Sequence, residues 1–145
     1  MCNDNNNSCG CGGNSEFSCG CNNNNNSCGC GCNQRSNDLG PNPITVNINQ
    51  MARSNTDFRN TYWTGENLQV TLMCIPVGCC IGLEVHRDND QFINIVQGEA
   101  LVQLGEAQCP RRVSCGNAII VPAGTWHNIT NIGNVPLKLY SIYAP

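Results

Sequence analysis

The chain has 145 residues, which is enough for one small domain and a terminal extension. Its net charge of −3 and its pI of about 5.1 exclude a strongly basic protein, so we expect no nucleic-acid partner. No apolar run approaches the ~20 residues that a membrane helix needs. The N-terminus also lacks the basic and apolar regions of a signal peptide. We therefore expect a cytoplasmic protein with no membrane partner.

Residues 1–40 are predicted to be a disordered, low-complexity tail rich in Cys, Asn and Gly. A Ser-Cys-Gly-Cys unit begins at Ser8, Ser18 and Ser27, with Asn-rich spacers between the units. So few apolar residues cannot offset the entropy of ordering such a segment. The paired thiols favour soft-metal binding or disulfide cross-linking, and the alternative is a solvated tail without a specific partner. Cross-linking would make the chain a structural protein of a disulfide-linked assembly, such as a spore coat.

A folded β domain is predicted over residues 41–145, where apolar and polar residues alternate from Ile44 onward. No segment of ten or more residues has the spacing of an amphipathic helix, so we expect none. Residues 105–114 are predicted to be a loop. Strands are predicted at 58–63, 68–74, 99–104, 117–121 and 137–143, with another that begins near His127. Seven or eight short strands joined by Gly, Pro and Asn turns favour a small all-β sandwich or barrel.

Two further strands, separated by a turn at residues 88–90, carry the polar side chains of most interest. Alternation places Glu84 and His86 on the same face of the first strand. The second strand is predicted from Gln91 to Gln97. If the two strands pair as a hairpin, Gln91 returns close to Glu84 and His86, and three potential metal ligands converge.

The spacing of these residues resembles the two motifs of the cupin superfamily. The first family motif is Gly, five residues, His-x-His, three or four residues, Glu, six residues and Gly. This chain has the same spacing, at Gly78, Glu84, His86, Gln91 and Gly98. The residues around this motif are similar to those of small bacterial single-domain cupins of the mannose-6-phosphate-isomerase-like subgroup.

The second family motif is Gly, five residues, Pro-x-Gly, two residues, His, three residues and Asn. The chain fits this motif without a gap, at Gly116, Pro122, Gly124, His127 and Asn131. The resemblance covers residues 41–145 and implies a small jelly-roll (cupin) barrel behind the tail.

The resemblance implies that Glu84, His86, Gln91 and His127 bind one divalent metal ion. Fe, Mn, Ni and Zn all suit these donors. Glu84 replaces the first His of the family motif, and Gln91 replaces its Glu. In an alternative register Asp88 is a ligand, but the gap to Gln91 then shortens to two residues. Two other interpretations remain. Glu84 and His86 could lie on the solvent-exposed face of a sheet, and Gln91 could be a structural amide that does not bind the metal.

The predicted function is that of a metal-binding cupin with a small-molecule ligand. Three functions remain open: a metalloenzyme of the oxygenase or isomerase type, a ligand-binding domain without turnover, or the structural protein described above. The fold alone does not determine which of them applies. We also expect a homodimer, since a domain of this size has a thin core and its sheet edges need cover.

Overall fold

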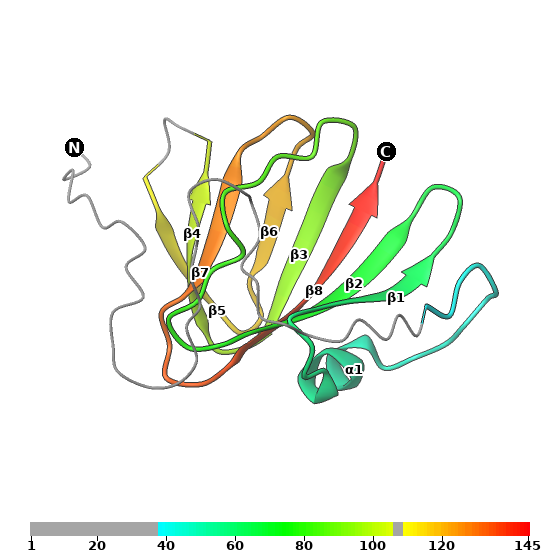
Figure 1. Ribbon diagram of the computed structural model, residues 1–145, viewed down its shortest axis with the longest axis horizontal. Helices are drawn as coiled ribbons and strands as arrows, with labels where there is room; N and C mark the ends of the chain where they lie inside the picture. Colours follow the sequence, from blue (N-terminus) through cyan, green and yellow to red (C-terminus); the bar gives the residue numbers. More distant parts are fainter. Residues whose placement is uncertain (1–37, 106–108) are drawn as a thin grey trace.

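The computed structural model describes residues 38–105 and 109–145. The predicted tail lies outside the described residues, apart from residues 38–40, so its disorder, its thiol chemistry and the domain boundary at residue 41 stay predictions. Within the described residues, no helix has the length and apolar character of a membrane span. These residues form one short helix and eight strands (Figure 1): α1 (Ile48–Ser54), β1 (Arg59–Thr64), β2 (Gln69–Ile75), β3 (Asp90–Gln97), β4 (Glu99–Leu104), β5 (Arg111–Ser114), β6 (Ala118–Val121), β7 (His127–Asn131) and β8 (Leu137–Ala144).

The strands form two antiparallel sheets that fan out from one end of the domain (Figure 1). The larger sheet has the order β1-β2-β8-β3-β6, and the smaller has the order β5-β4-β7. Helix α1 packs against the larger sheet, with contacts to β8, β2 and β3. The predicted all-β jelly-roll barrel is therefore confirmed.

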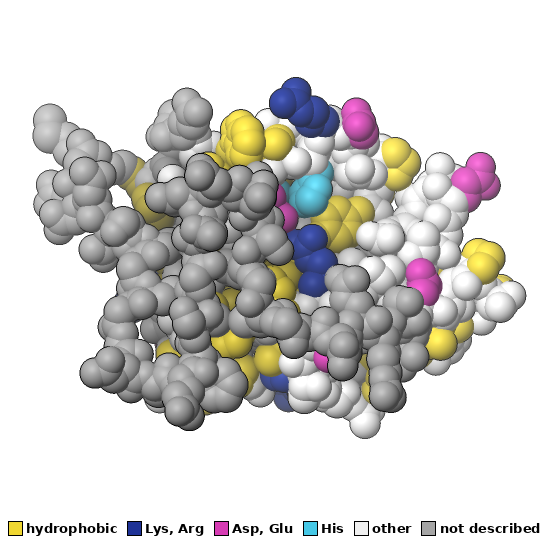
Figure 2. Space-filling view, viewed as in Figure 1, with side chains coloured by type: hydrophobic (Ala, Val, Ile, Leu, Met, Phe, Trp, Pro, Cys, Tyr) yellow, Lys and Arg dark blue, Asp and Glu magenta, His cyan; other side chains and the backbone are white. Residues whose placement is uncertain are grey.

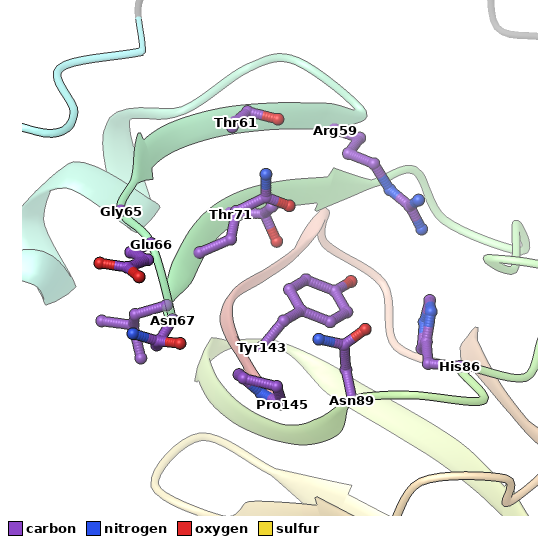
Figure 3. Close-up of a pocket in the computed structure, with 12 residues that line it drawn as sticks. Arg59, Thr61, Gly65, Glu66, Asn67, Thr71, His86, Asn89, Tyr143 and Pro145 are labelled. Atoms are coloured by element: carbon purple, nitrogen blue, oxygen red, sulfur yellow. The ribbon is translucent and has the colours of Figure 1, made fainter.

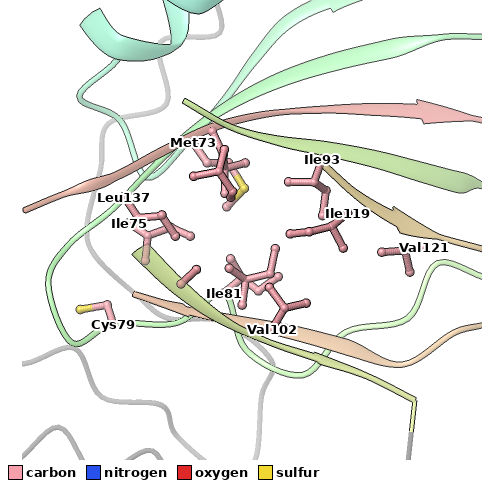
Figure 4. Close-up of a cluster of buried hydrophobic side chains, with 13 residues drawn as sticks. Met73, Ile75, Cys79, Ile81, Ile93, Val102, Ile119, Val121 and Leu137 are labelled. Carbon is pink, nitrogen blue, oxygen red and sulfur yellow. The ribbon is translucent and has the colours of Figure 1, made fainter. Parts of the chain in front are cut away.

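The hydrophobic core lies between the two sheets (Figure 4). Alternate residues of each strand point inward, and six isoleucine or leucine side chains of the core cluster are at most 1% exposed: Ile75 from β2, Ile93 and Ile95 from β3, Ile129 from β7, and Leu137 and Leu139 from β8. Burying a side chain of this size contributes about 1.5–3 kcal/mol. These side chains from both sheets form one cluster, so the core fixes how the sheets face each other.

The inward faces change from apolar to polar along the barrel. On β2, β3, β7 and β8, the inward residues beyond the apolar cluster are Thr71, Gln91, His127 and Ser141, and each is at most 3% exposed. Thr71 pairs with Ser141, and Gln91 pairs with Tyr143. The interior of the barrel is therefore apolar at one end, and at the other end it carries buried polar groups that need hydrogen-bond partners.

The predicted hairpin between the two strands of the first motif is wrong. Strand β3 pairs with β6 on one side and with β8 on the other, so neither of its edges is available to the preceding segment. Residues 80–84 instead run beside β7, through isolated bridges from Cys80 to Thr130 and from Glu84 to His127. The polar side chains of the motif therefore meet across the barrel rather than within one hairpin.

The expectation of no helix is also wrong, because α1 was too short for the ten-residue pattern. Asn47 caps the helix, and its side chain accepts a hydrogen bond from the backbone N–H of Gln50 at 3.1 Å. Ala52 is fully buried and packs in a cluster with Leu72 and Val96 on the outer face of the larger sheet. The predicted loop at residues 105–114 contains β5. The predicted strand that carries Glu84 and His86 is also wrong, because this segment makes only isolated bridges to β7. The remaining predicted strands are confirmed within two residues.

Candidate metal centre

Glu84 and His127 are neighbours because their backbones pair. The N–H of Glu84 donates to the carbonyl of His127 at 3.0 Å, and the N–H of His127 donates to the carbonyl of Glu84 at 2.9 Å. Directly paired antiparallel residues carry their side chains close together on one face. This two-way bridge places the carboxylate and the imidazole at the polar end of the barrel.

The Pro-x-Gly turn of the second motif brings His86 to the same place. The N–H of Thr125 donates to the carbonyl of Pro122 at 3.1 Å and closes the turn. Gly124 has a φ of 77°, and its N–H donates to the carbonyl of His86 at 2.7 Å. The two motifs are therefore joined by a backbone hydrogen bond, which holds His86 beside the strand that begins at His127.

The three side chains form a compact donor group. His86 Nε2 lies 3.7 Å and His127 Nε2 lies 3.6 Å from the same oxygen, Glu84 Oε1. One ligand atom of each residue falls within 4.8 Å of the other two. The imidazole centroids are 5.4 Å apart. The structure therefore brings together three of the four predicted site residues.

Both imidazole Nε2 atoms are buried and have no hydrogen-bond partner among the described residues. His127 is 1% exposed, and its Nδ1 lies 3.0 Å from the carbonyl oxygen of Thr125. That carbonyl can only accept, so Nδ1 carries the proton and Nε2 presents its lone pair to the centre. Two orphaned nitrogens that face one carboxylate fit a divalent metal ion of the first transition row.

The charge states of the group also suit a metal. Burial alone raises the pKa of the Glu84 carboxyl, but its contact with His127 and the charge of Arg59 outweigh burial and leave the pKa below 4.5. Burial lowers the pKa of His86 below 6.5, although the charge of Glu84 partly offsets this effect. At neutral pH the centre therefore offers an ionised carboxylate and an unprotonated imidazole, the forms that bind metals.

Gln91 lies at the start of β3 and is 3% exposed. Its Nε2 donates to the hydroxyl of Ser141 at 2.8 Å, whereas its Oε1 is buried without a partner in the described part of the chain. An orphaned amide oxygen suits a ligand, but a structural amide would make the same bond to Ser141. The role of Gln91 as the fourth ligand stays a prediction. Asp88, the ligand of the alternative register, is exposed and lies outside the donor group.

Two neighbours of the centre were not predicted from the sequence. Arg59 Nη2 lies 3.2 Å and 3.4 Å from the two oxygens of Glu84. The ring of Tyr143 meets the ring of His86 edge-on at 5.0 Å, and burial raises the pKa of this phenol despite the opposing charge of Arg59. The signal available was alternation, because Arg59 and Tyr143 continue the inward faces of β1 and β8.

A cavity of about 500 Å³ opens beside His86 and Tyr143, between them and the β1–β2 hairpin (Figure 3). Arg59 and Thr71 are among the residues that line it. In the space-filling view a histidine side chain is visible from outside, next to Lys or Arg side chains (Figure 2). The centre is therefore reached from solvent through a polar opening.

Comparisons with known proteins agree with this geometry. The family model described as "Cupin domain" matches residues 71–143. The chain is 52% identical to the uncharacterized protein YrkC of Bacillus subtilis over 112 residues, which cover 74% of this chain and 60% of YrkC. The chain therefore spans less than two thirds of that relative. These matches do not distinguish between subgroups, so membership of the mannose-6-phosphate-isomerase-like subgroup stays a prediction.

Solved structures give the same result. The crystal structure of BH2720 from Bacillus halodurans has a TM-score of 0.72 at 52% identity, and the match covers 74% of this chain and 85% of that one. An RmlC-like cupin family protein with a double-stranded β-helix fold from Methanocaldococcus jannaschii has a TM-score of 0.57 at 24% identity, over 62% of this chain and 81% of that one. The second similarity concerns the fold alone.

Proposed function

The chain belongs to the cupin family, and we propose that it is a metal-binding cupin that acts as a metalloenzyme on a small organic molecule. Glu84, His86 and His127 would hold one divalent ion, and the amide oxygen of Gln91 would be a fourth, neutral ligand. The observation that carries the proposal is the pair of buried imidazole Nε2 atoms that have no partner among the described residues and face one carboxylate oxygen. Ligand type does not select among Fe, Mn, Ni and Zn.

When bound, such an ion supplies Lewis-acid activation of an oxygen atom of the substrate. The other tasks fall to the chain. Arg59 holds the Glu84 carboxylate in place with one nitrogen, and the carbonyl of Thr125 keeps the imidazole of His127 in the tautomer that leaves Nε2 unprotonated. The cavity beside His86 would admit the substrate and limit the amount of water around it.

Two histidines and one carboxylate with open positions are also the donor set of many oxygen-using Fe(II) sites. This similarity favours an oxygenase, and an isomerase would use the same donors with another divalent ion. A ligand-binding domain without turnover is the alternative. The cross-linked structural protein depends on residues outside the described part of the chain and stays a separate prediction.

The test is the metal content of the full chain after its thiols have been alkylated, so that the cysteines cannot compete. We expect about one divalent ion per wild-type chain, as a single mononuclear site requires. The double variant His86→Ala, His127→Ala should lose this ion, because it removes both imidazole ligands. Glu66→Gln is the matched control, since Glu66 lines the neighbouring cavity but lies outside the donor group.

Retention of the ion in the double variant would refute the proposed centre. Loss of the ion in Glu66→Gln as well would indicate that any change near the cavity releases it, and would also count against the assignment. Circular dichroism of each variant shows whether the barrel has kept its fold.

A further inference from the structure

The cavity beside the centre is polar along most of its wall. It has a volume of about 500 Å³ and lies between the β1–β2 hairpin, the end of β8 and the segment that follows His86 (Figure 3). Side chains with hydroxyl or amide groups dominate the lining: Thr61, Asn67, Gln69, Thr71, Asn89 and Tyr143. Such a wall presents many groups that exchange hydrogen bonds with hydroxyls.

Arg59 is the arginine of this wall. Figure 3 shows its guanidinium directed toward His86 and Tyr143. Only Nη2 makes hydrogen bonds within the described residues, and both go to Glu84. An arginine has five N–H donors, so the N–H groups of Nε and Nη1 remain as single donors to an anionic oxygen.

A buried hydroxyl lies in the wall of the cavity. Thr71 is 2% exposed and lines the cavity, and its Oγ1 makes no hydrogen bond of ordinary length in the described part of the chain, although it lies near enough to the phenol of Tyr143 to oppose the rise in the pKa of that group. Leaving a buried polar group unpaired costs about 1–3 kcal/mol. A ligand hydroxyl in this part of the cavity would remove that cost.

Charge further restricts the ligand. Arg59 already offsets the charge of Glu84 through their contact. A divalent ion at the centre would therefore leave the cavity beside Arg59 positive, and the one acidic residue of the lining, Glu66, follows β1 in the turn to β2. A small anion is favoured there over a neutral or cationic molecule.

We propose that this cavity binds a small hydroxylated carboxylate, in which Arg59 binds the carboxylate and Thr71 contacts a hydroxyl group. The inference rests on the proposed function, because it names the class of substrate for the same centre. The remaining N–H donors of the arginine favour an anion over a neutral sugar, and the hydroxyl-rich wall favours a hydroxylated acid over an apolar acid.

The test compares gluconate with sorbitol, which has the same six-carbon polyhydroxyl skeleton without the carboxylate. Binding is measured by isothermal titration calorimetry on the full chain, both metal-loaded and metal-free, with the metal content of each sample determined. We expect gluconate to bind about tenfold or more tightly than sorbitol, as a charge-assisted hydrogen bond to arginine predicts.

Two variants assign the contacts. Arg59→Gln should weaken gluconate binding about tenfold in the metal-free chain, and in the loaded chain it should also weaken metal binding, because Arg59 holds the Glu84 carboxylate. Arg87→Gln, an exposed arginine outside the cavity lining, is its control and should change neither. Thr71→Val should weaken gluconate binding roughly fivefold while the unfolding temperature stays the same or rises, since it removes an unpaired buried hydroxyl. If Thr71 were only structural, Thr71→Val would not weaken gluconate binding while the unfolding temperature stayed the same or rose.

The inference is overturned if sorbitol binds as tightly as gluconate, if Arg59→Gln binds gluconate like the wild type, or if gluconate does not bind at up to about 10 mM. Its failure is distinct from that of the proposed function. A chain that takes up no metal but still prefers gluconate through Arg59 would refute the metal centre and support the anion site. A chain that binds metal and ignores gluconate would do the reverse.

Discussion

Gln91 is the residue on which the charge of the centre depends. Its Nε2 is fixed by Ser141, which leaves the buried Oε1 without a partner among the described residues. A neutral amide in this place makes the centre one charge more positive than a carboxylate would. The centre would then be a stronger Lewis acid that binds its ion less tightly.

Replacing Gln91 tests this role. Gln91→Glu should tighten metal binding about tenfold, because it adds a negative charge near the ion. Gln91→Leu should weaken metal binding if the amide is a ligand, and should leave it unchanged if the amide is only structural. Competition titration with a chelator measures both affinities. Gln97→Glu, at the far end of β3, is the control and should leave the metal affinity as in the wild type.

The role of Arg59 could not be predicted from residue spacing. Its contact with Glu84 joins residues that are 25 positions apart, on elements that no motif connects. The sequence placed Arg59 only in a predicted strand, at residues 58–63. Its role follows from the way in which β1 is placed over the polar end of the barrel.

At the scale of elements, the turn between β6 and β7 connects the two motifs. Gly124 occupies the left-handed region at a φ of 77°, and its N–H bonds to the carbonyl of His86. A side chain at this position would strain the backbone by about 1–2 kcal/mol. The strain would also reach His86 through that hydrogen bond.

Gly124→Ala should therefore destabilise the protein by about 1–2 kcal/mol and weaken metal binding roughly threefold to tenfold. Gly116→Ala is the matched control, because Gly116 has a φ of 90° in open space between β5 and β6. It should lose a similar amount of stability and keep the metal affinity. Urea unfolding and chelator competition measure the two quantities. Equal metal affinities in both variants would show that the turn does not position the centre.

Local patterns predicted strands well and pairings poorly. Strand β4 begins and ends at the predicted residues, Glu99 and Leu104, because alternation is a property of each strand alone. The hairpin failed because pairing depends on which edges of β3 are already occupied, and β6 and β8 lie far along the chain. The motif spacing still identified Glu84, His86 and His127, although the structural reason for their meeting was different.

At the scale of the whole molecule, the larger sheet has an apolar row on its outer face. Val70, Ile142, Phe92 and Ile120 are successive cross-strand partners on β2, β8, β3 and β6. Helix α1 packs beside this row, against Leu72 and other residues of the same face. Ile120 is 60% exposed. We propose that this row is the interface of a homodimer, since a two-fold axis would pair it with its own copy.

Ile120→Glu should convert the dimer to a monomer, because it places a charge within the apolar contact, at its β6 end. Val135→Glu, at another exposed apolar residue in the loop before β8, is the control and should leave the dimer intact. Sedimentation equilibrium of the full chain under reducing conditions measures the mass. A wild-type chain that sediments as a monomer, or an Ile120→Glu variant that stays dimeric, would contradict the interface.

The central claim is that one end of the barrel holds a metal ion through its imidazoles, and nitrogen NMR tests it most directly. The chain has only two histidines, so the ring nitrogens of a ¹⁵N-labelled sample can be assigned with one variant. With the thiols alkylated, about one equivalent of Zn²⁺ should shift the Nε2 resonances of both His86 and His127, whereas Nδ1 of His127 should keep its proton. Unchanged Nε2 resonances with Zn²⁺ present would contradict a metal centre at this end of the barrel.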